Sequence, residues 1–114
     1  MINRPDKVRI GSFDFDVIWE GQAFERSARS VAQIDCHLYT IRIAETSQSY
    51  SLACRFLHEI IHGIIFYQEN CHDDSMREED CCNVGSYGIV DFWRSNPEVF
   101  KWWISLINPN IIKE

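Results

Sequence analysis

The sequence lacks the features by which several classes of protein are recognised. Lysine and arginine form no cluster and the formal net charge is −6, which argues against nucleic-acid binding and mildly favours neutral or basic substrates. The first residues lack the apolar core of a signal peptide, and no apolar run approaches the roughly 18 residues of a membrane span. Repeats and linkers are also absent. We therefore expect one domain over residues 1–114, acting away from membranes and nucleic acid.

A disulfide framework is also missing from the sequence. The number of cysteines is odd, and their spacing matches no secreted scaffold: Cys36, Cys54, Cys71, Cys81 and Cys82. The adjacent pair at 81 and 82 suits neither a CxxC zinc site nor a disulfide between its own members. Reduced thiols in a cytoplasmic protein are the simplest interpretation.

One short motif, HEIIH at residues 58–62, indicates a specific chemistry. On a helix, residues i and i+4 share a face, so His58 and His62 could bind one tetrahedral zinc at about 2.0–2.1 Å each. Glu59 is rotated by about 100° around the helix axis, so it need not be a ligand. It could instead accept a proton from zinc-bound water. This arrangement is typical of a zinc hydrolase.

The motif requires a helix, and residues 51–67 predict one. The segment contains no proline and a single glycine, and apolar residues recur with the helical period at Leu52, Phe56, Ile60, Ile64 and Tyr67. Ser47, Gln48 and Ser49 are candidates for its N-cap. The alternative is a core helix that carries two histidines by chance. A buried helix rarely places a carboxylate between such histidines unless something pairs with it.

The first half of the chain alternates between apolar and polar residues, which predicts strands. Residues 8–10 and 13–19 form one expected hairpin, and residues 33–39 and 40–44 are expected to form a strand, a turn and a further strand. Residues 20–33 fit either a short helix or a loop.

The second half of the chain is predicted to be helical. A helix over about residues 77–95 follows the helix that carries HEIIH, here called the metal helix. Asn96 followed by Pro97 marks the start of a third helix. Strands followed by helices indicate an α+β fold, with the metal helix packed on a small N-terminal antiparallel sheet. The third helix, VFKWWISLI, is apolar on nearly every face. It either covers the core as a lid or forms a homodimer surface.

A zinc site with two histidines needs a third protein ligand and keeps one position for water. Glu78, Glu79 and Asp80 lie at the start of the second helix, where carboxylates also simply favour the helix dipole. Glu79 best shares the expected apolar side of that helix, and Glu78 is nearly as good. That side is expected to contain Cys82, Gly85 or Ser86, Ile89 and Trp93. His72 and Asp73, in the preceding connector, are weaker candidates.

The chain resembles the small phage and prophage zincins of the minigluzincin kind. The resemblance covers most of the chain and rests on the segments VRIGSFDFDVIWE, QIDCHLYTIRIAE, FLHEIIHGI and EEDCCNVGSYGIVDFWRSNP. Ile65 and Gln68 stand where a metzincin has glycine and histidine, which excludes that class. The chain departs from the minigluzincin pattern at Gly63, where alanine is usual, and at Cys81 and Cys82, where aliphatic residues are usual.

The resemblance implies a minimal zincin-like fold and a zinc-dependent metallopeptidase with one zinc per chain. His58, His62 and Glu79 would be the metal ligands, and Glu59 would be the catalytic general base. An extended peptide or protein substrate would add to a sheet edge beside the cleft. The expected location is the cytoplasm of a bacterium or a phage-infected host cell. Two alternatives remain: a zinc-containing protein-binding module with vestigial catalysis, and a phage structural or interaction protein.

Overall fold

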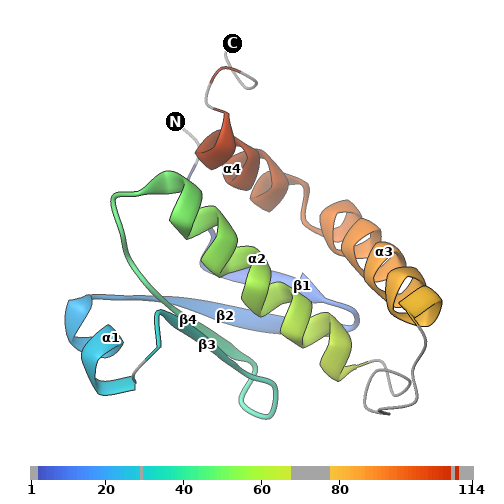
Figure 1. Ribbon diagram of the computed structural model, residues 1–114, viewed down its shortest axis with the longest axis horizontal. Coiled ribbons are helices and arrows are strands. Elements are labelled where there is room, and N and C mark those ends of the chain that lie inside the picture. Colours follow the sequence, from blue (N-terminus) through green and yellow to red (C-terminus); the bar gives the residue numbers. More distant parts are fainter. Residues whose placement is uncertain (1–2, 29, 68–77, 109, 111–114) are drawn as a thin grey trace.

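The computed structural model describes residues 3–28, 30–67, 78–108 and 110, and of residues 78–81 it describes the backbone alone. Strands come first and helices follow, which confirms the α+β class (Figure 1). The elements are, in chain order, β1 (Lys7–Ile10), β2 (Phe13–Glu20), α1 (Gln22–Ala28), β3 (Ala32–Asp35), β4 (Thr40–Ala44), α2 (Ser49–Phe66), α3 (Glu78–Ser95) and α4 (Pro97–Ile107).

The four strands form one sheet in the order β1-β2-β4-β3. The pairs β1–β2 and β3–β4 are antiparallel as expected, but β2 and β4 are parallel, so the sheet is mixed and not wholly antiparallel. The reason is the connection through α1, which places β3 at the outer edge. Because β4 turns back between β3 and β2 and runs opposite to β3, it runs in the same direction as β2.

One face of the sheet is apolar and the other is charged. The apolar face carries six buried side chains: Val8, Ile10, Phe15, Val17, Ile41 and Ile43. The opposite face carries the ion pairs Lys7–Asp16, Arg9–Asp14 and Arg42–Glu20. Because successive strand residues point to opposite faces, this alternation leaves one surface on which a helix can pack. Helix α2 lies across that surface, and α3 and α4 lie on the side of α2 that is away from β3 (Figure 1).

Tertiary packing, and not a side-chain cap, holds α2 in place. Gln48 is the N-cap residue, one of the three expected positions, but its side chain forms no capping hydrogen bond. The apolar stripe is buried as expected at Phe56, Ile60 and Ile64. Burial of such a stripe supplies most of the stability of a helix in a protein.

Two glycines allow α2 to pack closely against its neighbours. A Cβ atom on Gly63 would lie 2.7 Å from Cδ1 of Ile10 and 3.1 Å from Cδ1 of Ile34. A Cβ atom on Gly88 in α3 would lie 2.4 Å from Cγ2 of Ile64. Glycine at residue 63 therefore lets α2 approach β1 and β3 more closely than alanine would.

The packed face of α3 differs in part from the expected one. Ile89 and Trp93 pack against the core as expected, but Cys82 and Ser86 are exposed. Gly88 packs closely against α2, because a residue without a side chain leaves room for the branched side chain of Ile64. The face of α3 that packs on α2 therefore includes Gly88 and excludes Cys82 and Ser86.

Helix α4 covers the core, which was one of the two roles expected for it. Val99 and Trp102 are buried, and the indole nitrogen of Trp103 donates a hydrogen bond of 2.9 Å to the carbonyl oxygen of Ala53 in α2. The other role, a homodimer surface, stays a prediction.

Asn96, the N-cap residue of α4, has a role that its position did not indicate. Its side chain forms no cap. The amide oxygen instead accepts the N–H of Arg9 at 2.9 Å, and the amide nitrogen donates to the carbonyl oxygens of Arg9 and Phe92, each at 2.8 Å. Arg9 lies on β1, an edge strand, so this buried amide joins the sheet edge to the α3–α4 corner.

We expect Asn96→Ala to lower the free energy of unfolding by on the order of 3 kcal/mol, because it leaves one buried and two partly buried main-chain groups without these partners. Urea denaturation followed by tryptophan fluorescence would measure the change. Asn83→Ala, at an exposed position of α3, is the matched control and should change stability by less than about 0.5 kcal/mol. An Asn96→Ala variant as stable as the control would show that the amide bonds are dispensable.

Candidate metal centre

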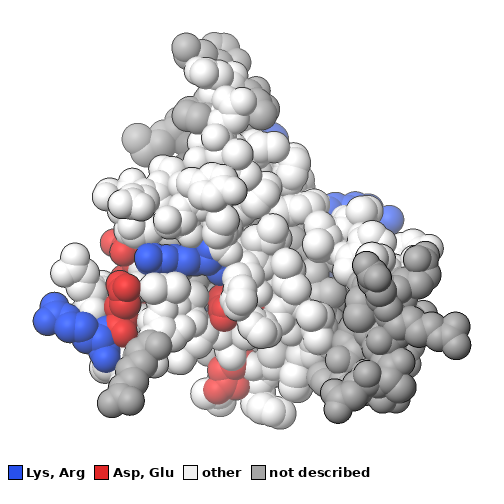
Figure 2. Space-filling view, viewed as in Figure 1, with Lys and Arg blue, Asp and Glu red and all other residues white. Residues whose placement is uncertain are grey.

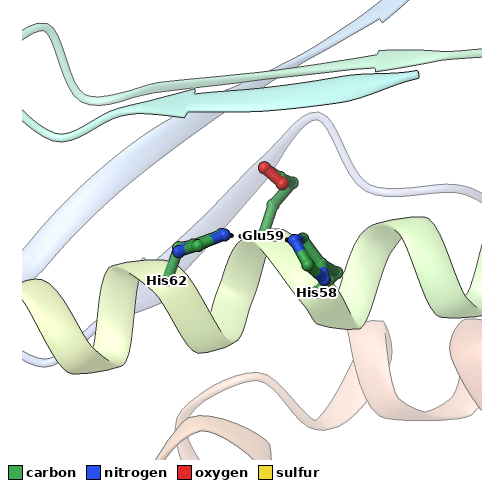
Figure 3. Close-up of side chains that lie close together, drawn as sticks. All are labelled: His58, Glu59 and His62. Atoms are coloured by element: carbon green, nitrogen blue, oxygen red, sulfur yellow. Dashed lines mark hydrogen bonds between the residues drawn. The ribbon is translucent and has the colours of Figure 1, made fainter. Parts of the chain in front are cut away.

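His58 and His62 lie one turn apart on the exposed side of α2, and their rings turn toward each other (Figure 3). The two Nε2 atoms are 3.1 Å apart, and the ring centroids are 4.7 Å apart in an edge-to-face arrangement. Helical spacing brings both rings to one side of the helix, as the sequence predicted. No large side-chain movement is therefore needed to aim both nitrogens at one ion.

The spacing of these nitrogens matches a tetrahedral metal site. Two ligands about 2.0–2.1 Å from one tetrahedral ion are separated by roughly 3.3–3.4 Å, close to the observed distance. His58, Glu59 and His62 form a group that could hold a metal ion, with ligand atoms all within 4.8 Å of one another. Without a metal, the same distance suits a hydrogen bond in which one neutral ring donates to the other.

Glu59 lies between the histidines but projects toward the sheet (Figure 3). It is 4 % exposed, although both histidines are exposed. Burial raises the pKa of the Glu59 carboxyl above its ordinary value of 4.5, and the neighbouring His58 and His62 partly oppose this. A carboxyl whose pKa is raised toward neutral is a better proton acceptor and donor than an ordinary glutamate.

The raised pKa of Glu59 predicts a pH dependence of stability in the metal-free protein. Because the folded state binds this proton more tightly than the unfolded state, the resulting stabilisation is complete below the ordinary pKa of 4.5. It is lost as the pH rises through the higher folded-state value. We therefore expect Glu59→Gln to raise the melting temperature of the chelator-treated protein, by more at pH 7 than at pH 4.

Thermal melts across this pH range would test that prediction. Glu98→Gln, at an exposed residue of α4, is the matched control and should show no such trend. A difference between Glu59→Gln and the wild type that stays constant with pH would contradict the prediction.

The proposed third ligands lie outside the residues whose side chains the structure describes. Glu79, the first choice, and Glu78 lie in the first turn of α3, where the backbone alone is described. His72 and Asp73 lie in residues 68–77, outside the described part of the chain.

A cleft of about 880 Å³ lies between α2 and the edge strand β3. One wall is formed by residues 30–37, which include β3 and the start of the turn after it. Helix α2 contributes Cys54, Arg55, His58, Glu59, His62 and Phe66. The candidate metal ligands of α2 therefore open onto a cleft that runs beside a sheet edge, as the sequence-based interpretation required.

No family model, curated protein or solved structure matches the chain. The resemblance to the minigluzincins therefore stays an expectation based on motifs, and the candidate centre rests on its own geometry. Among the described helices, none has the length and apolar character to cross a membrane.

Several residues of the cleft were not singled out from the sequence. Arg55 precedes Glu59 by one helical turn, and Cys54 precedes His58 in the same way, so helical spacing could have identified both. His37 is exposed and also lines the cleft, with its ring centroid 5.6 Å from that of Phe66.

Proposed function

We propose that this chain is a zinc-dependent metallopeptidase. The metal would be held by His58, His62 and a carboxylate from the start of α3, with Glu79 the first choice and Glu78 the second. The observation that carries the proposal is the 3.1 Å separation of the two histidine Nε2 atoms, with the buried Glu59 between them and a cleft in front. A chance pair of core histidines would not be expected to combine these features.

In this proposal the metal and Glu59 have separate roles in hydrolysis. Bound zinc would supply a Lewis acid that polarises the substrate carbonyl and makes water more acidic. Glu59 would take a proton from the attacking water and deliver it to the leaving amine. Its burial favours both steps, because it raises the pKa of the carboxyl toward neutral.

The outer edge of β3, with which no described strand pairs, supports a peptide as the substrate. The Ala44 N–H donates to the Val31 carbonyl at 2.8 Å, so in an antiparallel pair the main-chain groups of Ala32 and Ile34 point outward. The Ser30 hydroxyl bonds to both outward groups of Ala32. Ile34 is left to exchange hydrogen bonds with an added strand, which would bind whatever its sequence.

Metal analysis of protein purified without chelator tests the proposal most directly. We expect about one zinc per chain after metal loading, and a large loss in His58→Ala and in His62→Ala. His37→Ala is the control, because His37 lines the same cleft but lies outside the described metal-binding group. Zinc below about a tenth of an equivalent in the wild type would rule out the metallopeptidase.

A further inference from the structure

Arg55 is a cation in the cleft that forms no ion pair with a described carboxylate. Its guanidinium donates one hydrogen bond, from Nη1 to the carbonyl oxygen of Ala44 at 2.9 Å. The ion pairs of the described residues involve other cations: Arg4, Lys7, Arg9, Arg42, Arg94 and Lys101. Glu59, one turn further along α2, forms no ion pair with Arg55 among these, and its side chain turns toward the sheet (Figure 3).

A half-buried arginine that forms no ion pair with the described residues can bind an anionic group of a ligand. The guanidinium has five N–H donors in a planar fork, and the bond to Ala44 uses one of them. The fork matches the two oxygens of a carboxylate, which it binds through paired charge-assisted hydrogen bonds. The Ala44 carbonyl holds the guanidinium at the cleft, so little additional side-chain entropy is lost when a ligand binds.

The position of Arg55 relative to β3 gives the bound peptide a direction. Ile34 packs at Gly63 and the ring of His37 contacts that of Phe66, so β3 runs alongside α2 in the same direction (Figure 3). Arg55 therefore lies at the beginning of β3. A peptide added antiparallel to β3, the more stable pairing, would place its C-terminal half at this end of the cleft.

We propose that Arg55 selects peptides with a carboxylate shortly after the cleaved bond. This inference rests on the proposed function. Arg55 precedes Glu59 by one helical turn, or about 6 Å along the axis at 1.5 Å per residue. An extended peptide advances about 3.3 Å per residue, so the arginine would meet the first to third residue beyond the cleaved bond. The carboxylate belongs either to an aspartate or glutamate side chain or to the C-terminus of a short substrate.

The distribution of charge favours this contact despite the acidic character of the chain. A net charge of −6 repels an acidic peptide at long range, but salt screens that repulsion beyond about 8 Å. Figure 2 shows the face on which α2 lies, where uncharged side chains cover most of the surface. Asp35 lines the opposite end of the cleft, and its carboxylate accepts the N–H groups of His37 and Leu38. The cleft thus has a cation at one end and an anion at the other.

Peptide binding to the zinc-loaded Glu59→Gln variant tests the inference without turnover. Peptide pairs that differ only by Glu or Gln at one position, scanned along the sequence, would be compared by fluorescence anisotropy. We expect Glu in the C-terminal half to bind roughly tenfold more tightly, as a charge-assisted hydrogen bond predicts. Short peptides with a free or an amidated C-terminus distinguish a terminal carboxylate from a side chain.

Variants of Arg55 connect the preference to this residue. Arg55→Gln, added to the Glu59→Gln variant, should abolish the preference for Glu over Gln peptides. Arg55→Lys should retain part of this preference, because lysine keeps the charge without the planar fork. Arg94→Gln, at an exposed arginine of α3, is the control and should leave it unchanged. If Arg55→Gln fails to fold, the preference of the parent protein should still decrease as salt is added.

Equal affinity for Glu and Gln peptides, a preference in the N-terminal half, a preference that Arg55→Gln leaves intact, or no binding of any peptide would each overturn the inference. The proposed peptidase is judged separately, by zinc content and by hydrolysis that depends on Glu59. A chain that prefers acidic peptides through Arg55 but holds no zinc would lose the proposed function and the cleaved bond, and would keep Arg55 only as a residue that binds peptide carboxylates.

Discussion

Glu59→Gln is expected to keep its zinc and to hydrolyse peptides about a hundredfold more slowly or worse. The amide has nearly the shape of the carboxylate, so it should fill the same buried space beside His58 and His62. It cannot accept a proton near neutral pH, and removal of a general base typically costs at least this factor. This is the largest catalytic effect that a conservative substitution should produce in the chain.

Zinc content and turnover of a peptide mixture, measured on the same preparation, would check this prediction. Glu98→Gln, on the exposed side of α4, is the control and should leave both unchanged. Undiminished turnover would give Glu59 another role, and loss of zinc would make it a ligand. Zinc without turnover in the wild type would favour a zinc-containing binding module with vestigial catalysis.

Glu79→Ala is expected to weaken zinc binding more than about a hundredfold, whereas Glu78→Ala and Asp80→Ala should change it by a few fold. Removal of residues that only support a ligand already costs roughly 10–100-fold in affinity, and loss of a ligand should cost more. A carboxylate that only complements the helix dipole contributes about 0.3–1 kcal/mol. Competition against a chelator of known affinity would measure all three variants.

The packing of α3 would explain the opposite result, in which Glu78→Ala weakens zinc binding more than Glu79→Ala. The line of close packing on α2 passes through Gly88 and Phe92, and the helical period extends it back to position 78 and not to 79. If Glu78→Ala is the damaging change, the face expected from Cys82 and Ser86 is the cause of the error. If no substitution at 78–80 matters, His72 and Asp73 are the next residues to test.

The sequence predicted the features of the fold that depend on neighbours in the chain. The helix around HEIIH, the two strand pairs and the start of α4 at Pro97 all follow from local periodicity, turn residues or proline. The parallel pairing of β2 with β4 did not follow, because alternation identifies the buried face of a strand but not its partner. The bonds from Asn96 to Arg9 were missed for a related reason: they join residues 87 positions apart.

The candidate site divides in the same way. His58, Glu59 and His62 could be predicted because one helical turn brings them together whatever the rest of the fold does. Arg55 lies one turn before Glu59, so helical spacing could have identified it as well. His37 enters the cleft only because α2 packs along β3, and the sequence could not place it there without the order of the strands.

The two edges of the sheet also bear on how the chain avoids aggregation. At the β1 edge the Asn96 amide occupies both main-chain groups of Arg9, and at the β3 edge the Ser30 hydroxyl occupies those of Ala32. Exposed edges promote intermolecular strand pairing, and these contacts reduce the number of main-chain groups that each edge can present to another chain. Ile34 keeps its outward main-chain groups, which can form hydrogen bonds to a bound peptide. An edge interrupted in this way is a poorer template for the continuous ladder of a fibril.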